Sequence, residues 1–269
     1  AFGHQMAEHY ASANEAAIEE YERLVRDKGI DCDFCRCPAY LYSQIETESL
    51  KREADAAESL GIKASFGTEC ELPFPVAGVT RFDHQARFHP LKFLAGMAEE
   101  VEVYEQTKVL KVDGRRVETA SGTVTAEHIV FAAHYPFINV PGYYFARMHQ
   151  ERSYVVALEG AVRPKGMYLG IDQGGLSFRT CGDLLLLGGG GHRTGVNQGN
   201  MAGTGCRYEL LRNRSREIYP ECHEISRWSA QDCMTLDGLP YIGRFSKRRP
   251  NWYVATGFGK WGMTTAMVA

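Results

Sequence analysis

The chain has 269 residues, 44% of them hydrophobic and 23% charged, and a formal net charge of −3. This length suffices for one large core or for two packed lobes. The small negative charge offers no electrostatic attraction to nucleic acid or to an anionic membrane surface. No apolar run approaches the ~20 residues of a membrane-spanning helix. We therefore expect a globular protein that neither spans a membrane nor binds nucleic acid.

The eight cysteines are too sparse for a disulfide scaffold, which favours a reducing, cytoplasmic setting. Three of them form the cluster Cys32-x-x-Cys35-x-Cys37. A structural zinc ion normally needs four ligands, usually from a second close pair of cysteines or histidines. The sequence holds no second C-x-x-C. We expect plain thiols here and no metal site, with a structural zinc as the alternative.

Helices are predicted in the first third of the chain. The first thirty residues are predicted to form a helix, because apolar residues recur at three- and four-residue steps over 10–25 and Gly29 follows as a stop signal. The same spacing predicts a helix over 46–60. Pro90 stands where the first turn of a helix tolerates proline, so a short helix is predicted over 90–98.

Strands are predicted from residue 101 onward, where the apolar period changes to two. Asp113-Gly114 and Ser121-Gly122 are turn signals, which indicate a meander of short strands. This order of elements is typical of a mixed α/β or α+β fold with two interleaved lobes. The remaining predicted elements are a buried strand over 129–133, a strand-rich region over 154–187, a helix over 207–219 and a strand over 252–255.

A glycine motif lies near the end of the chain. Gly257, Gly259 and Gly262 form a literal G-x-G-x-x-G between a predicted strand and a predicted apolar helix over 263–269. A dinucleotide site also needs a second strand and an acidic residue ~20 positions later, which this sequence does not supply. A helix N-terminus still offers unpaired N–H groups to an electron-rich group such as a flavin carbonyl. A tight turn packed on a neighbouring strand is the alternative.

Five segments, in the same order, resemble the family of FAD-dependent amine and amino-acid oxidoreductases, which includes glycine oxidase and D-amino-acid oxidase. Within this family, the sequence most resembles a subgroup whose longer members carry a C-terminal Rieske iron–sulfur domain. The five segments are RFDHQARFHPLKFL (81–94), VEVYEQTKVLKV (101–112), IVFAAHYP (129–136), TLDGLPYIGR (235–244) and NWYVATGFGKWGMTTAMVA (251–269).

The resemblance implies a two-lobed α/β fold that binds FAD. It assigns residues 1–35, 79–140 and 233–269 to the flavin-binding lobe, and 36–78 and 141–232 to an antiparallel-sheet substrate lobe. The family's N-terminal strand, first glycine loop and ribose-binding acid have no counterpart in this sequence. We therefore expect a segment of a longer protein, inactive alone and with weak or absent FAD binding.

The resemblance also implies which residues contact FAD. In the family, the N-terminus of the final helix points at the pyrimidine edge of the flavin. The end of the adenine strand corresponds to Val109, and the turn near the pyrophosphate corresponds to Ala132 and Ala133. The flavin-edge contacts fall on Gly257, Phe258, Gly259, Lys260, Trp261, Gly262, Met263 and Thr264.

Asp232 departs from the family pattern. Glycine oxidase-like members carry an arginine at this place, which clamps the substrate carboxylate through two hydrogen bonds. An aspartate would repel a carboxylate and attract an ammonium group. We therefore expect a small-molecule amine, or an amino compound with a second cationic group, as substrate. The alternative is that Asp232 is a structural carboxylate paired inside the fold.

The implied reaction is hydride transfer from the carbon that bears the amine to the flavin, followed by hydrolysis of the imine. No catalytic residue is assigned, but Lys260 and Asp232 are candidates. Lys260 is expected either beside the flavin or solvated, and Arg179 either at the substrate cavity or in an ion pair. The electron acceptor is oxygen or an iron–sulfur or other carrier. Two rivals stay open, a non-catalytic module with this fold and an oxidoreductase that acts on a hydroxyl group.

Overall fold

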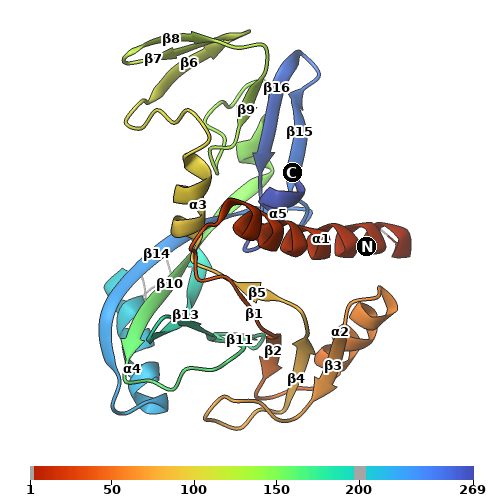
Figure 1. Ribbon diagram of the computed structural model, residues 1–269, viewed down its shortest axis with the longest axis vertical. Helices are drawn as coiled ribbons and strands as arrows, with labels where there is room; N and C mark the ends of the chain where they lie inside the picture. Colours follow the sequence, from red (N-terminus) through yellow and green to blue (C-terminus); the bar gives the residue numbers. More distant parts are fainter. Residues whose placement is uncertain (1–2, 197–203) are drawn as a thin grey trace. The chain divides into compact units, whose positions relative to one another are not determined.

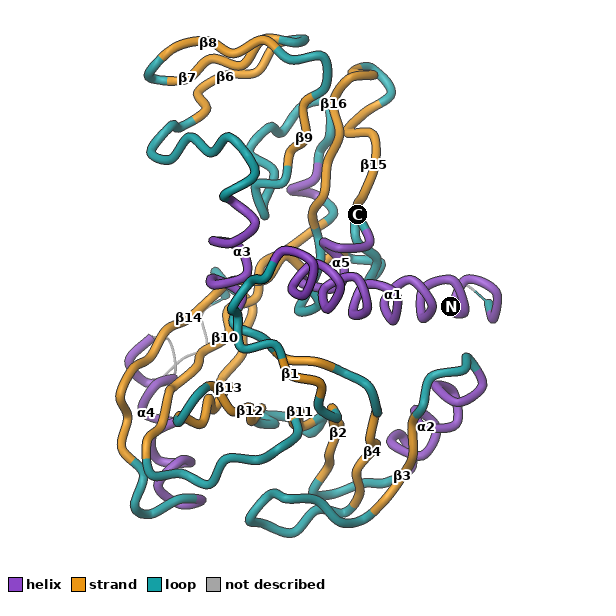
Figure 2. Tube along the Cα trace, viewed as in Figure 1, coloured by secondary structure: helices purple, strands orange, loops and turns teal. Residues whose placement is uncertain are grey.

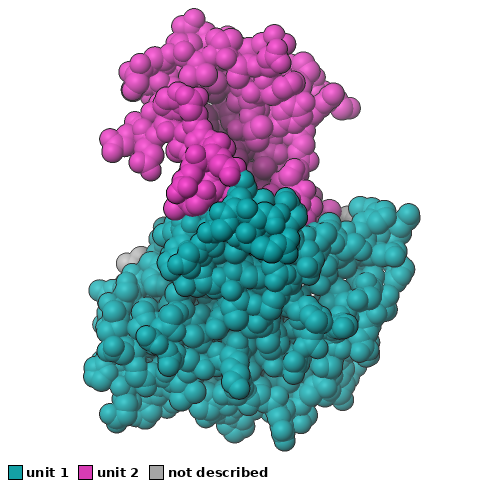
Figure 3. Space-filling model, in the orientation of Figure 1, with its two compact units in different colours: residues 1–93, 152–231 teal, residues 94–151, 232–269 magenta. Residues whose placement is uncertain are grey.

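The computed structural model describes residues 3–196 and 204–269. The chain forms two compact units, shown in different colours in Figure 3. Unit 1 comprises Ala1–Phe93 and Arg152–Gln231, and unit 2 comprises Leu94–Glu151 and Asp232–Ala269. Each unit combines helices with strands, so the predicted mixed α/β class with two interleaved lobes is confirmed.

Unit 1 is built on an eight-stranded sheet with the order β14-β10-β13-β12-β11-β2-β4-β3 (Figure 1). Its β2 and β11 pair in parallel, whereas β2–β4, β3–β4, β11–β12 and β12–β13 are antiparallel. The first part of β10 and the last part of β14 belong to unit 2. The strands are β2 (Ala39–Ser43), β3 (Ala64–Gly67), β4 (Gly78–Phe82), β10 (Met148–Glu159), β11 (Met167–Gly170), β12 (Ser177–Cys181), β13 (Leu184–Arg193) and β14 (His223–Thr235).

The core of unit 1 lies on one face of this sheet. Alternate residues of β12 and β13 point into it, among them the fully buried Phe178, Leu185 and Leu187. Helix α4 (Thr204–Ile218) adds the buried Leu211. A side chain at Gly189 would come within 2.8 Å of the Leu176 side chain, so glycine in β13 lets the helix and the neighbouring loop approach the strand closely.

The other helices of unit 1 are α1 (His4–Lys28) and α2 (Glu48–Ser59). Helix α1 ends at Gly29, which adopts the left-handed conformation at φ 63° as its predicted role requires. Helix α2 lies along β3 and β4 (Figure 2). A two-stranded ladder, β1 (Cys35–Arg36) with β5 (Ala86–Arg87), completes the unit.

Unit 2 contains two three-stranded sheets, which form separate layers in Figure 1. One is the predicted meander, and the other has the order β15-β16-β9, with β9 parallel to β16. Phe131, Phe245 and Trp252 pack together in the core between the strands. The elements are β6 (Val109–Asp113), β7 (Arg116–Thr119), β8 (Gly122–Thr125), β9 (Ile129–Phe131), β15 (Tyr241–Ser246), β16 (Arg249–Thr256), α3 (Pro90–Ala98, which begins in unit 1), the 3₁₀ helix η1 (Tyr144–Ala146) and α5 (Gly262–Val268).

One prediction about strands is wrong, and several strands were not predicted. The meander begins at Val109 and not at residue 101, because the alternating Val101 and Val103 are exposed and pair with no strand of the described chain. The longest of the unpredicted strands is β14, whose residues are mostly partly or fully exposed and therefore lack an apolar period. The predicted helices are otherwise found within a few residues of their expected ends.

The compact units divide the chain differently from the two functional lobes assigned by resemblance. Residues 1–35 and 79–93 fold with unit 1, together with 36–78. This division describes internal packing and not which segments bind flavin. The assignment of flavin-binding and substrate lobes therefore stays a prediction.

Candidate functional site

The glycine motif forms a tight turn between β16 and α5. Gly257 and Gly259 have φ angles of 73° and 56°, which only glycine adopts without strain. A side chain at Gly257 would collide with the methyl group of Thr235. The Gly259 N–H donates a hydrogen bond of 3.0 Å to the Cys233 carbonyl oxygen. The turn is therefore packed on the end of β14, as the alternative interpretation of the motif expects.

This packing leaves the start of α5 accessible. A side chain added at Gly262 would meet no atom within 4 Å, and the neighbouring Trp261 is exposed. The N–H groups in the first turn of a helix have no acceptor within the helix. A row of donors with open space beside a glycine fits the electron-rich carbonyl edge of a flavin. The motif thus serves the turn and leaves room for a ligand at the same time.

Two predicted cofactor-contacting segments meet at one sheet edge. Strands β9 and β16 are parallel, with Phe131 opposite Val254, so their carboxyl ends lie at the same edge. Ala132 and Ala133 follow β9 there and are exposed, and Gly257 follows β16. The crevice outside the carboxyl ends of parallel strands is where ligands bind in α/β sheets. Val109 stands apart from this edge, at the start of β6 in the meander.

The two candidate catalytic side chains contact each other. Lys260 Nζ lies 3.2 Å from Asp232 Oδ2 and 3.7 Å from Glu151 Oε2. Glu151 Oε1 in turn lies 3.6 Å from His149 Nε2. All four residues belong to unit 2. Asp232 is therefore a paired carboxylate, and Lys260 is held between two carboxylates.

The cluster of Asp232, Glu151 and Lys260 carries two negative charges and one positive charge, a net charge of −1. The cluster therefore stays negative in spite of Lys260. At the position of Asp232, glycine oxidase-like members carry a positively charged arginine. Sequence reasoning missed Glu151 and His149. Their two-residue spacing puts both on one face of a strand, but only the pairing of β10 with β14 brings them near Asp232.

Arg179 lies on β12 in unit 1 and lines a pocket there. Its Nη1 donates a hydrogen bond of 3.5 Å to the Phe88 carbonyl oxygen. Within residues 3–196 and 204–269 it forms no ion pair, so that alternative for Arg179 is not realised among them.

The cysteine cluster at 32–37 consists of three free thiols. Cys32 and Cys37 are buried and Cys35 is exposed. Across the described residues, no group of three histidine, cysteine, aspartate or glutamate side chains is suitably placed to hold a metal ion. None of the described helices is both long and apolar enough to cross a bilayer.

A model of the family described as FAD dependent oxidoreductase matches residues 2–269. The chain belongs to this family. It is 34% identical over 284 residues to YhfW of Bacillus subtilis (strain 168), whose name describes a Rieske 2Fe-2S iron–sulfur protein. That match covers 100% of this chain and 55% of the relative, so the chain spans about half the length of the curated relative.

Solved structures of an oxidase and a dehydrogenase share the fold of this chain. Glycine oxidase from Geobacillus kaustophilus superposes with a TM-score of 0.77 at 20% identity, over 95% of this chain and 74% of that chain. L-proline dehydrogenase from P. horikoshii gives a TM-score of 0.77 at 15% identity, over 95% of this chain and 75% of that chain. The resemblance drawn from the five sequence segments is thus confirmed, and the name of YhfW agrees with the Rieske-associated subgroup.

Proposed function

We propose that the full-length protein oxidises the CH–NH bond of a small amine or amino compound, with FAD as hydride acceptor. The observation that carries this proposal is the sheet edge at the ends of β9 and β16, with the accessible start of α5 beside it. Membership of the FAD-dependent oxidoreductase family supports the cofactor. Bound FAD would supply the redox chemistry, and the protein would supply binding, orientation and electrostatics.

Each segment has a proposed task. The N–H groups of Gly262, Met263 and Thr264 would stabilise negative charge at the flavin carbonyl edge, since they lie in the first turn of α5. The backbone from Gly257 to Trp261 would face the same edge. Ala132 and Ala133 would approach the pyrophosphate, and Val109 would lie near the adenine.

The charged cluster supports an amine as substrate. Asp232, Glu151 and Lys260 together carry a net charge of −1, which attracts an ammonium group and repels a carboxylate. A second cationic group on the substrate would strengthen this attraction. Lys260 would orient Asp232 through the contact of 3.2 Å. The opposing candidate, a hydroxyl substrate, gains nothing from a negative cluster.

We also propose that residues 1–269 alone bind FAD weakly and are inactive. The sequence contains one G-x-G-x-x-G, at 257–262, and no counterpart of the family's first glycine loop. In this type of fold, that loop and its helix form the main anion site for the pyrophosphate. Stoichiometric FAD in the purified 269-residue chain would contradict this part of the proposal.

The test uses the full-length protein under anaerobic conditions. It should purify yellow, and amines or diamines should bleach the flavin absorption band faster than glycine or a 2-hydroxy acid. Asp232→Asn should raise the KM for a diamine by about tenfold, as expected for the loss of a charged contact. Asp113→Asn is the matched control, because Asp113 also forms an ion pair in unit 2, with Arg249, but is exposed at the meander.

The remaining outcomes identify the rivals. A colourless protein that binds no flavin would favour the non-catalytic module. Bleaching by the hydroxy acid alone would favour the hydroxyl oxidoreductase. Reoxidation of the bleached protein by air identifies oxygen as acceptor, whereas reoxidation only by an added iron–sulfur protein identifies a carrier.

A further inference from the structure

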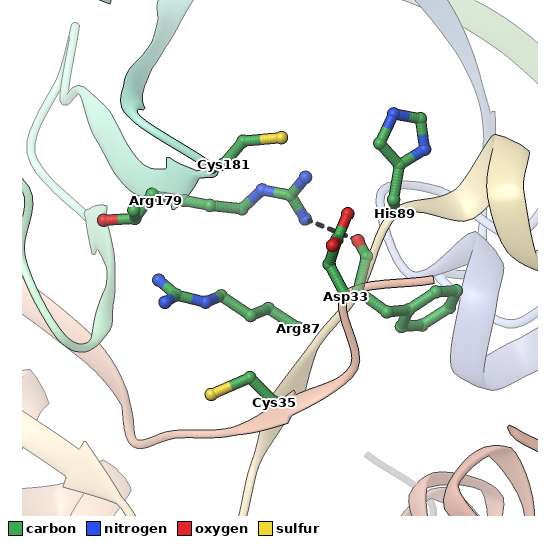
Figure 4. A pocket seen from close by; sticks show the side chains of 9 residues that line it. Asp33, Cys35, Arg87, His89, Arg179 and Cys181 are labelled. Carbon is green, nitrogen blue, oxygen red and sulfur yellow. Dashed lines mark hydrogen bonds between the residues drawn. The ribbon is translucent and has the colours of Figure 1, made fainter. Parts of the chain in front are cut away.

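Unit 1 contains a pocket of about 190 Å³ to which the proposed redox steps assign no task. It lies between the β1–β5 ladder and the end of β12, and Figure 4 shows its lining side chains. Its chemistry comes from two arginines, a histidine, two cysteines and one aspartate. These are Arg87, Arg179, His89, Cys35, Cys181 and Asp33.

The two guanidinium groups reach the pocket from different strands, Arg87 from β5 and Arg179 from β12. Arg87 Nη1 is buried and has no hydrogen-bond partner among the described residues. A buried donor without a partner destabilises the folded protein, so native structures seldom leave one unused. Arg179 Nη1 makes one long hydrogen bond, 3.5 Å to the Phe88 carbonyl oxygen. Both arginines therefore have capacity for a further acceptor.

The pocket's own carboxylate does not neutralise these charges. Asp33 Oδ2 is bound by Lys92 Nζ at 2.8 Å. Neither Arg87 nor Arg179 forms an ion pair with any residue in the described ranges. The two positive charges also act together on the buried Cys37. Burial raises the pKa of that thiol, and the charges of both arginines lower it.

We propose that Arg87 and Arg179 form a binding site for an oxyanion, the carboxylate or phosphate group of a small ligand. The planar fork of a guanidinium matches both groups and can bind them through two parallel hydrogen bonds. The pocket is large enough for such a group and a short carbon chain. An acceptor here would satisfy Arg87 Nη1 and reduce the repulsion between the two arginines. Because every residue involved belongs to unit 1, the site does not depend on the proposed flavin edge in unit 2.

The first test is calorimetric titration of the full-length protein with inorganic phosphate, and separately with succinate. We expect saturable binding of at least one of them. Arg87→Gln and Arg179→Gln should each weaken this binding about tenfold, since each removes a charge-assisted hydrogen bond to the anion. The control Arg23→Gln, at an exposed arginine of unit 1 that is paired with Glu20 and Asp27, should leave the affinity unchanged. Tighter binding of phosphate than of succinate assigns the site to a phosphate group, and the reverse assigns it to a carboxylate.

The second test measures the local charge of the pocket independently of its affinity for anions. Cys35 lines the pocket and is exposed, so alkylating reagents can reach it. Iodoacetate is anionic and iodoacetamide neutral, so the ratio of their labelling rates at Cys35 reports the local positive charge. The Arg87→Gln/Arg179→Gln variant should lower this ratio several-fold. The Arg87→Lys/Arg179→Lys variant should preserve the ratio but weaken anion binding, because lysine keeps the charge and loses the fork.

Two results would overturn the proposal. One is no saturable binding of either anion to the folded wild-type protein. The other is binding, or a labelling ratio, that the double glutamine variant leaves unchanged while its melting temperature stays that of the wild type. Loss of flavin reduction in the same variants bears on neither result, since both readouts are made without substrate.

Discussion

Lys260 Nζ lies 3.2 Å from Asp232 Oδ2, and this pair ties the glycine turn after β16 to the end of β14. The two side chains are 45% and 25% exposed, so water screens their attraction. We expect a double-mutant cycle of Asp232→Asn and Lys260→Met to give a coupling free energy of about 0.2–1 kcal/mol in urea unfolding. The pair would then serve mainly the electrostatics of the site.

A second double-mutant cycle, with Glu151 in place of Asp232, serves as the control. Glu151 Oε2 lies 3.7 Å from Lys260 Nζ, so a second cycle with Glu151→Gln should give a smaller coupling at the longer distance. A coupling above about 2 kcal/mol for either pair would mean that the cluster is a stability element, and the argument for an ammonium-binding role would lose its basis.

Gly257 is where the glycine motif is most constrained. Gly257→Ala should destabilise the protein, by about 1–2 kcal/mol for the positive φ and by about 1–3 kcal/mol for the collision with the Thr235 methyl group. The measurement is the free energy of unfolding in urea. Adding Thr235→Ser removes that methyl group and should recover the collision part only.

Gly262→Ala is the matched control for this variant. A side chain there meets no atom within 4 Å, and the residue begins a helix, so we expect a change within about 0.5 kcal/mol. Equal destabilisation by the two substitutions would contradict the packing of the turn on β14. If flavin lies beside α5 as proposed, Gly262→Ala should instead weaken flavin retention in the full-length protein.

Elements that depend on a few neighbouring residues could be predicted from the sequence, and elements that depend on distant partners could not. The turn at 113–114 and the helix stop at Gly29 were predictable because each depends on the conformation of a few neighbouring residues. Strand β14 was not, because an exposed strand has no apolar period to reveal it. Its existence depends on partners that are distant in the sequence.

The site divides in the same way. The glycine turn and the departure at Asp232 are visible in the sequence, since both belong to recognisable segments. The contact of Lys260 with Glu151 is not, because it requires two strands and a turn from separate parts of the chain. The pairing of Arg87 with Arg179 around one pocket has the same origin, since their strands belong to different sheets.

Trp252 anchors the meander to the sheet of β9, β15 and β16. Its Nε1–H donates a hydrogen bond of 2.6 Å to the Gly114 carbonyl oxygen, which also accepts one of 3.1 Å from Asn251 Nδ2. In each single variant, Trp252→Phe or Asn251→Ala, the Gly114 oxygen keeps one of its two hydrogen-bond donors. The double variant leaves the Gly114 oxygen without either donor. Its loss in the free energy of unfolding, measured in urea, should therefore exceed the sum of the two single losses by about 1 kcal/mol. Additivity within about 0.3 kcal/mol would show that water replaces the donors.

Tyr42 links the stability of unit 1 to alkaline pH. Its side chain is buried in the core and its hydroxyl donates a hydrogen bond of 3.0 Å to the Leu176 carbonyl oxygen. Burial raises the pKa of Tyr42 to about 12, whereas a tyrosine in an unfolded chain ionises near 10. The folded state thus favours the neutral hydroxyl. The pKa difference contributes about 2–3 kcal/mol to the free energy of unfolding. This contribution is complete below pH 10 and is lost as the pH rises through 12.

The effect of Tyr42→Phe on the free energy of unfolding should therefore change sign between pH 8 and pH 12. At pH 8 the variant lacks the hydrogen bond to Leu176 and should be less stable by about 1 kcal/mol. At pH 12 it has no hydroxyl to ionise on unfolding, so it should match or exceed the wild type. Urea unfolding at pH 8, 10, 11 and 12 measures the difference, and Tyr104→Phe, at an exposed tyrosine, controls for the general loss of ion pairs. A difference between Tyr42→Phe and the wild type that is constant across this range would show that Tyr42 is not the group that titrates.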